Sequence, residues 1–265
     1  MSTVDKNRQY RVALNFTNQE KLKKFFKGTD ITVINWRKIQ EYNSRLIDIF
    51  LRINHIVCEK YRKNEEQMLQ LQDKLLEAYN ALKKYKVIET KFNNNGRTEE
   101  DVYYNWMRGY LVSLYFIETI SDIFAVNVEE IEQLGEDNIE ELISTHDPDI
   151  FKKEAIADLK IESKKIHIEV QSGFTGVNDI KKSKADDAKR RYSENGWKTV
   201  IVHFDLFRGL VAAVDITKLS DELPEKQWKN NKQFENVKTT PIKDACFVWR
   251  ITEETELNDI MTTIQ

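Results

Sequence analysis

The chain has few of the residues that turn or cross-link a small protein. Its 265 residues include only 3 prolines, 8 glycines and 2 cysteines. So few turn-forming residues argue against a β-sandwich or a barrel, because those folds alternate short strands with frequent turns. Cys58 and Cys246 are too few and too far apart for a disulfide framework or a zinc cluster. These absences favour a protein of a reducing compartment.

The sequence also lacks a long apolar run and an excess of charge of one sign. No apolar segment approaches the length that spans a bilayer, and the first residues lack the apolar core of a signal peptide. We therefore expect a soluble cytoplasmic protein with no membrane partner. Acidic residues (44) and basic residues (41) nearly cancel, for a formal net charge of -3. That balance excludes a nucleic-acid coat protein but allows positive charge gathered in one cleft.

What is present in the first half of the chain is helical periodicity. Apolar residues recur at helical spacing over residues 35–60 and 65–86. Thr98 is a suitable N-cap for a strongly apolar helix that runs to about residue 124. One or two short acidic helices are expected over residues 128–143. The first half therefore predicts a layer of packed helices.

After residue 147 the pattern changes to the alternation that is typical of strands. Two alternating segments, 155–161 and 166–171, flank a polar turn and predict a β-hairpin. The elements expected after it are a charged helix over 178–195 closed by Gly196, strands over 197–204, 209–216 and 245–251, and a short terminal helix. This order predicts an α/β (α+β) fold with a mixed central sheet and flanking helices. A helical region (1–125) and a sheet region (126–265) would form one compact domain.

The predicted hairpin brings two acidic side chains together. A turn centred on Ser163 and Lys164 places Asp158 directly across from Glu169, on the same face as Gln171. Like charges so placed destabilise a hairpin, but a divalent cation between them removes the conflict, and their hard oxygen ligands suit magnesium. An ordinary amphipathic hairpin with an acidic exposed face explains the same pattern. The pairing alone therefore leaves both interpretations open.

Asp158, followed eleven residues later by Glu169-Val170-Gln171, resembles the PD-(D/E)xK nuclease motif in the E-x-Q variant of some type II restriction endonucleases. The order of helix, hairpin, crossover helix and buried strand over roughly residues 129–216 is similar as well. The resemblance implies a restriction-endonuclease-like core that uses Mg²⁺, or Mn²⁺, to cut double-stranded DNA at a short specific site. The expected products carry 5′-phosphate ends.

The resemblance also implies roles for individual residues. Asp158, Glu169 and the main-chain carbonyl of Val170 would hold the metal. Gln171 stands where lysine is usual, and its amide can orient water or phosphate but cannot relay a proton near neutral pH. Asp149, in a Pro-Asp pair twenty residues before Glu169, is the alternative first ligand, although direct pairing across the hairpin favours Asp158. Upstream helix acids often join such sites, and the candidates are Glu118, Glu140 and Glu141.

Charge is unevenly distributed along the chain. Residues 126–154 contain ten acids and two lysines, whereas residues 178–198 contain seven basic and four acidic residues, and residues 4–39 contain nine basic and three acidic. Basic residues that flank a metal site are expected to contact phosphates. The expected contacts are Lys181, Lys182, Lys184, Lys189, Arg190 and Arg191, with Lys226, Lys229 and Lys232 as a second edge.

These features together predict a type II restriction endonuclease. Cutting both strands of a symmetric site favours a homodimer, with the helical region supplying the dimer seam and some contacts to DNA. One alternative is another nuclease on the same core, acting in repair, recombination or defence against mobile elements. A second alternative is a non-catalytic DNA-binding or scaffold protein that retains the fold.

Overall fold

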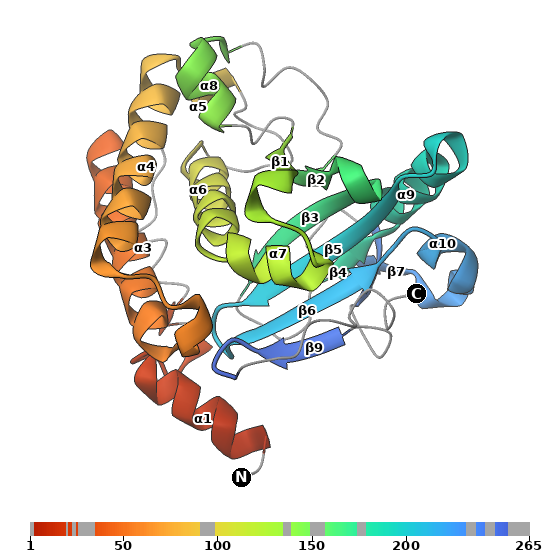
Figure 1. Cartoon of the computed structure of the whole chain (residues 1–265), viewed down its shortest axis with the longest axis horizontal. Helices are drawn as coiled ribbons and strands as arrows, with labels where there is room; N and C mark the ends of the chain where they lie inside the picture. The colour runs from red at the N-terminus through yellow and green to blue at the C-terminus, as the bar shows by residue number, and fades with distance from the viewer. Residues whose placement is uncertain are drawn as a thin grey trace.

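The computed structural model describes residues 3–19, 21–22, 25, 35–90, 99–134, 139–148, 157–173, 179–231, 237–241 and 247–253. In this part of the chain, a layer of helices packs on a mixed six-stranded sheet, and a three-stranded sheet lies beside it (Figure 1). The prediction of a mixed central sheet with flanking helices is confirmed. None of the described helices combines the length and the apolar character needed to cross a membrane.

The first half of the described chain is helical, as its periodicity predicts. Its helices are α1 (Thr3–Ala13), α3 (Trp36–Ile56), α4 (Glu65–Lys84), α5 (Val87–Thr90), α6 (Glu99–Tyr115), α7 (Ile117–Phe124) and α8 (Ile139–Thr145). Capping fixes where the long helices begin, because Asn35 accepts from the Lys38 amide, and Asn64 forms a capping box with Gln67.

The helix predicted over residues 99–124 is divided in two. Phe116 leaves helical geometry between α6 and α7. Its ring stacks on Phe204 of the sheet, with ring centroids 4.5 Å apart. Packing on the sheet thus outweighs the continuous helical pattern of the sequence.

The main sheet has the strand order β1-β2-β3-β5-β6-β9, and the small sheet has the order β4-β8-β7. Their strands are β1 (Ile131–Gln133), β2 (Leu159–Ile161), β3 (Ile166–Gly173), β4 (Asp179–Lys181), β5 (Lys198–Asp205), β6 (Leu210–Asp215), β7 (Lys229–Asn231), β8 (Val237–Pro241) and β9 (Phe247–Arg250). Parallel strands β3 and β5 are joined through β4 and the crossover helix α9 (Lys182–Asn195), and α10 (Leu219–Glu222) follows β6. Short 3₁₀ turns span Glu59–Tyr61, Val128–Glu130, Glu162–Lys164 and Glu225–Gln227.

Three details of the sheet region differ from the prediction. Residues 131–133 form a strand against β2, where a short acidic helix was expected. Residues 179–181 pair with β8 as strand β4, so the charged helix begins at Lys182. The terminal helix predicted after residue 251 lies outside the described residues. Both of the new strands have only three residues, too few to show an alternating pattern.

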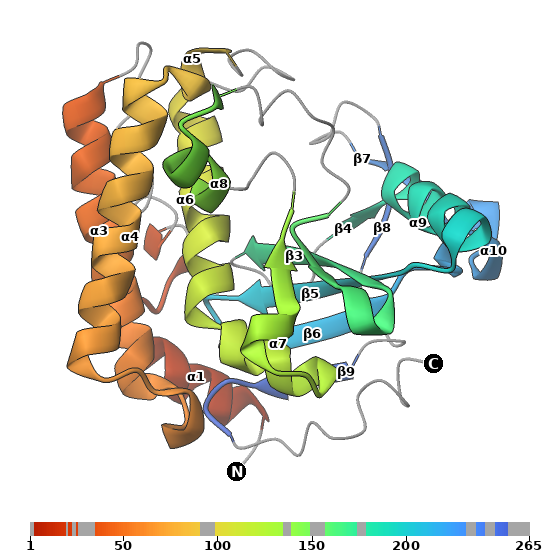
Figure 2. The same ribbon diagram turned by 45° about the horizontal axis from the view of Figure 1, so that its top comes forward.

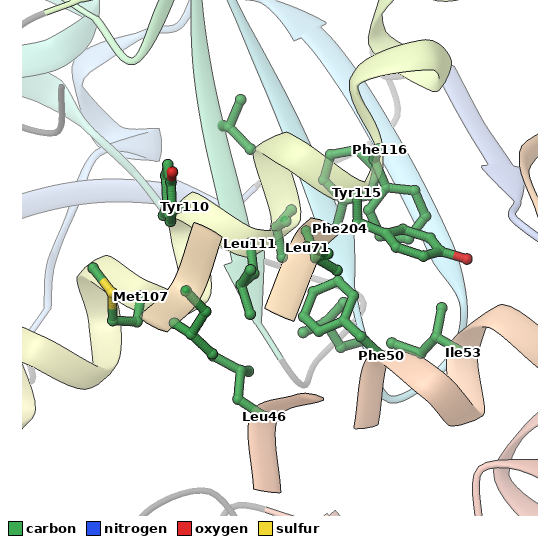
Figure 3. Packing of buried hydrophobic residues seen from close by; sticks show 14 of the residues in the cluster. Leu46, Phe50, Ile53, Leu71, Met107, Tyr110, Leu111, Tyr115, Phe116 and Phe204 are labelled. Carbon is green, nitrogen blue, oxygen red and sulfur yellow. The ribbon is translucent and has the colours of Figure 1, made fainter. Parts of the chain in front are cut away.

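One hydrophobic core joins the helical and sheet regions. α6 lies between α4 and the main sheet, and α9 and α10 lie on the side away from α3 and α4 (Figure 2). Figure 3 shows side chains of α3, α6 and β5 gathered in this core, among them Phe50, Leu111, Tyr115 and Phe204. The opposite face of the sheet packs on α9 through Ile201 and Val214.

The hairpin has the predicted register. Leu159 pairs with Ile168, and Ile161 pairs with Ile166. The polar face is not exposed, however, since His167 and Glu169 retain only 6% and 8% of their accessible surface. The interpretation of an acidic face open to solvent is therefore wrong for Glu169.

Candidate active site

The candidate site lies where β2 separates from β3. The amide of Asp158 still donates to the carbonyl of Ile168 at 3.1 Å, which continues the ladder by one residue. The next contact is made by a side chain, because the Val170 amide donates to Oδ2 of Asp158 at 2.6 Å. The Asp158 carboxylate thus satisfies a strand amide at the point where β2 ends. This exchange leaves the edge of β3 open beyond the hairpin.

A cavity of about 440 Å³ occupies this opening. Side chains from the hairpin, from α6 and from the β4–α9 segment form its walls. All the residues that the sequence assigns to metal binding and catalysis line it, namely Asp158, Glu169, Val170 and Gln171. Asp149, the alternative first ligand, lies outside the described residues.

Glu169 forms an ion pair with a lysine from the crossover helix. The ammonium of Lys184, in the first turn of α9, contacts Oε2 of Glu169. The Glu169 side chain is 10% exposed, whereas that of Lys184 is 39% exposed. A carboxylate this buried requires a partner, since an unpaired buried charge is strongly destabilising. The cavity therefore contains an ammonium group although Gln171 stands at the usual lysine position.

The oxygen atoms of the cavity fit a magnesium ion. Mg²⁺ is usually held by one or two carboxylates together with waters and substrate phosphate. Asp158 and Glu169 supply two carboxylates, and the carbonyl of Val170 is a third hard oxygen. Asp179 also lines the cavity, but its carboxylate accepts from Thr239 at 3.0 Å and from Asn231. Within the described ranges, no group of three or more His, Cys, Asp or Glu residues is arranged for metal binding.

The predicted phosphate contacts are only partly at the cavity. Of the six residues, Lys181 and Lys184 line its described wall. Three others form ion pairs with acids of α9 and α10, namely Lys182 with Asp186, Lys189 with Asp221, and Arg190 with Glu194. Arg191 lies near His167, toward the turn of the hairpin. In the second predicted edge, Lys226 and Lys229 are exposed, and Lys232 is outside the described residues.

The predicted upstream acids lie elsewhere. Glu118 pairs with Lys63 at 2.7 Å, and Glu140 pairs with Lys74 at 2.8 Å. Among the described lining residues, neither of these acids nor Glu141 is present. The helix that faces the hairpin thus contributes other chemistry to the cavity.

That chemistry comes from α6, which the sequence did not assign to the site. The lining residues from this helix are Asn105, Trp106, Arg108, Gly109, Tyr110 and Ser113. The guanidinium of Arg108 donates from Nε to Ser172 Oγ at 2.9 Å and from Nη2 to Asn105 Oδ1 at 3.0 Å. Burial lowers the pKa of this guanidinium. The signal that could have revealed this wall is the presence of polar residues inside a strongly apolar helix.

Comparison of the chain with protein-family models, curated proteins and solved structures finds no match. The functional argument therefore depends on the geometry and chemistry of the cavity.

Proposed function

We propose that this protein is a Mg²⁺-dependent nuclease that hydrolyses phosphodiester bonds of double-stranded DNA at a short specific site, as type II restriction endonucleases do. One observation carries the proposal: Asp158, Glu169 and Gln171 line the same cavity, and Lys184 contacts Glu169 there. Two carboxylates and an ammonium group around one cavity suit the chemistry of a phosphodiester.

Each residue has a distinct task in this proposal. Asp158, Glu169 and the carbonyl of Val170 would hold Mg²⁺. When bound, the ion supplies Lewis-acid stabilisation of the phosphate and lowers the pKa of a coordinated water. Gln171 orients the water or a phosphate oxygen through its amide. The ammonium of Lys184 stabilises the negative charge that develops on the phosphate.

The ion pair also explains how two acids coexist at the mouth of the hairpin. The Val170 amide donates to Asp158, and Lys184 neutralises Glu169. When Mg²⁺ binds, the ion compensates the Glu169 charge, and the Lys184 ammonium becomes available to the substrate. Two copies of the chain would cut both strands of a symmetric site.

The test is cleavage of plasmid and genomic DNA by the purified full chain. We expect linear products with 5′-phosphate ends in Mg²⁺ and no cleavage in EDTA. Asp158→Ala and Glu169→Ala should each lower the rate at least about 100-fold, because each removes a metal ligand. The matched control is Glu77→Ala, which removes an exposed carboxylate of α4 and should cut at the wild-type rate.

The alternatives predict different results. If Asp158→Ala or Glu169→Ala cuts as fast as the wild type, the site assignment is wrong. If the wild type binds DNA but never cuts it in Mg²⁺ or Mn²⁺, a non-catalytic DNA-binding protein is the better description. Mapping the fragment ends of digested genomic DNA tests site specificity, since scattered ends contradict a type II enzyme.

A further inference from the structure

α6 leaves an unfilled space on the cavity side. Gly109 lies inside this 17-residue helix and lines the cavity. A Cβ atom placed on Gly109 meets no atom of the described residues within 4 Å. Glycine weakens a helix interior relative to alanine, and packing within the described chain does not require it here. The missing side chain therefore keeps part of the cavity open at the expense of helix stability.

The residues around this space suit a nucleotide. Trp106 and Ser113 lie three residues before and four residues after Gly109, so the three share one face of the helix. All three line the cavity. An indole ring offers a surface on which any nucleobase can stack. The ammonium groups of Lys181 and Lys184, at the same cavity, suit the phosphate that such a base would carry.

A polar group on the cavity wall also points to a ligand. Gln133 of β1 lines the cavity, and its Oε1 is buried without a hydrogen-bond partner in the described part of the chain. Buried polar atoms are nearly always hydrogen-bonded, so an exception requires a reason. A carboxamide can both accept from and donate to the edge of a base, and a bound nucleotide would satisfy it.

The size of the cavity decides which form of DNA can enter it. Its volume of about 440 Å³ falls in the range of roughly 300–1,000 Å³ that is typical of small-ligand sites. A duplex cannot enter, because the major groove alone is about 12 Å wide. A single nucleotide can enter once it leaves the base stack.

We propose that Trp106, Gly109 and Ser113 form a subsite that seats one unstacked nucleotide of the cut strand beside the scissile phosphate. This inference rests on the proposed function, which places that phosphate at Asp158 and Glu169. Unstacking a nucleotide costs least when its base is mismatched or unpaired. The enzyme should therefore cut a strand faster where a nucleotide next to the scissile bond is unpaired.

The first experiment measures binding without cleavage. A single-stranded thymidine tetranucleotide is titrated into the full chain in EDTA while tryptophan fluorescence is recorded. The wild type should show quenching that saturates, and Trp106→Phe should lose most of the quenching while it still binds the tetranucleotide in a competition assay. Gly109→Leu should weaken binding at least tenfold, because leucine fills the space. Asn80→Leu, on the exposed face of α4, should bind as the wild type does.

The second experiment compares cleavage of matched duplexes with duplexes that carry one mismatch beside the cut site. The wild type should cut the mismatched strand at least about fivefold faster, and Gly109→Leu should lose this preference. Far-UV circular dichroism during heating checks that Gly109→Leu is folded, and we expect its melting temperature to be no lower than that of the wild type.

The two proposals can fail separately. If Gly109→Leu is folded, binds the tetranucleotide and cuts as the wild type does, the subsite is wrong and the nuclease assignment stands. If the wild type never cuts DNA but the tetranucleotide quenches Trp106 and Gly109→Leu blocks it, the subsite stands and the nuclease assignment fails. If the wild type shows no quenching and no mismatch preference, the subsite is overturned.

Discussion

Lys184 supplies an ammonium group to a site whose motif ends in glutamine. Its contact with Glu169 is the ion pair nearest to the proposed chemistry. We expect Lys184→Met to lower kcat by about 10²–10³-fold, the loss typical when one group that stabilises transition-state charge is removed. Lys184→Arg should retain part of the rate because it keeps the charge. The measurement is single-turnover cleavage in Mg²⁺.

A matched control separates this role from loss of a stabilising ion pair. Lys60 forms a 2.5 Å pair with Asp122 in the helical layer, so Lys60→Met removes a lysine–carboxylate contact without touching the cavity. It should cut at the wild-type rate. If Lys184→Met is folded and also cuts at that rate, Gln171 and the two carboxylates act without the ammonium.

His167 makes the folded state sensitive to acid. The imidazole stacks on Trp197, with ring centroids 4.4 Å apart. Burial, followed by the nearby charges of Arg191 and Lys160, lowers its pKa from 6.5 to about 4. Between these values the unfolded chain binds a proton that the folded chain does not. The free energy of unfolding should therefore fall as the pH is lowered from about 6.5 to 4, by roughly 1–3 kcal/mol from this residue.

Urea denaturation at several pH values measures this effect. His167→Gln, which cannot titrate, should show a shallower loss of stability over the same interval. Equal pH dependence of the two proteins would mean that the imidazole already carries its proton in the folded state.

At the scale of elements, the turn between β5 and β6 depends on one glycine. Gly209 has φ +66°, and a Cβ there would lie 2.5 Å from the ring of Tyr10 in α1. Gly196, the C-cap of α9, has φ +77° but open space around it. We expect Gly196→Ala to cost about 1 kcal/mol from backbone strain. Gly209→Ala should cost roughly 2–4 kcal/mol, because the side chain also displaces packed atoms.

Urea unfolding of the two variants tests this difference. Equal losses would show that Tyr10 moves aside at little cost. A larger loss for Gly209→Ala would confirm that α1 and the sheet turn are packed as one unit.

The sequence predicted elements whose pattern is local and long. α3 and α4 followed from apolar spacing, and the hairpin register followed from the polar turn at Ser163 and Lys164. β1 and β4 were missed because strands of three residues carry no measurable period. The break at Phe116 was missed because a ring on the sheet, rather than a helix breaker, ends α6.

The candidate site was predictable only along one hairpin. Asp158 and Glu169 are brought together by pairing between neighbouring strands, which sequence spacing can express. The contact of Lys184 with Glu169 depends on how α9 crosses the sheet, and the place of Arg108 depends on which strand α6 faces. Neither crossing is encoded in the spacing of residues along the chain.

At the scale of the whole molecule, one core implies one unfolding transition. Buried residues from Tyr10 to Ile251 belong to a single cluster that joins the helical region and the main sheet. We expect thermal unfolding followed by tryptophan fluorescence and by far-UV circular dichroism to give coincident curves. Trp36 and Trp106 report on the helices, and Trp249 reports on the sheet. Two separate transitions would show that residues 1–125 fold as an independent domain.

The near balance of charge conceals how the charges are placed. The chain carries 44 acidic and 41 basic residues, yet three of the six basic residues predicted at the site are paired with acids on α9 and α10. Lys181, Lys184 and Arg108 line the cavity together with Asp158 and Glu169. A cavity that holds both carboxylates and cations suits a metal ion and a phosphate in the same place.

The most direct test of the nuclease assignment is the cleavage rate of Glu169→Gln beside that of the wild type, in Mg²⁺ and on one end-labelled DNA substrate. Glutamine keeps the size of the side chain but removes the charge that would hold both the metal and Lys184. We predict that the wild type cuts the substrate and that Glu169→Gln cuts it at least about 1,000-fold more slowly. Equal rates for the two proteins would contradict a metal-dependent nuclease site at Asp158 and Glu169.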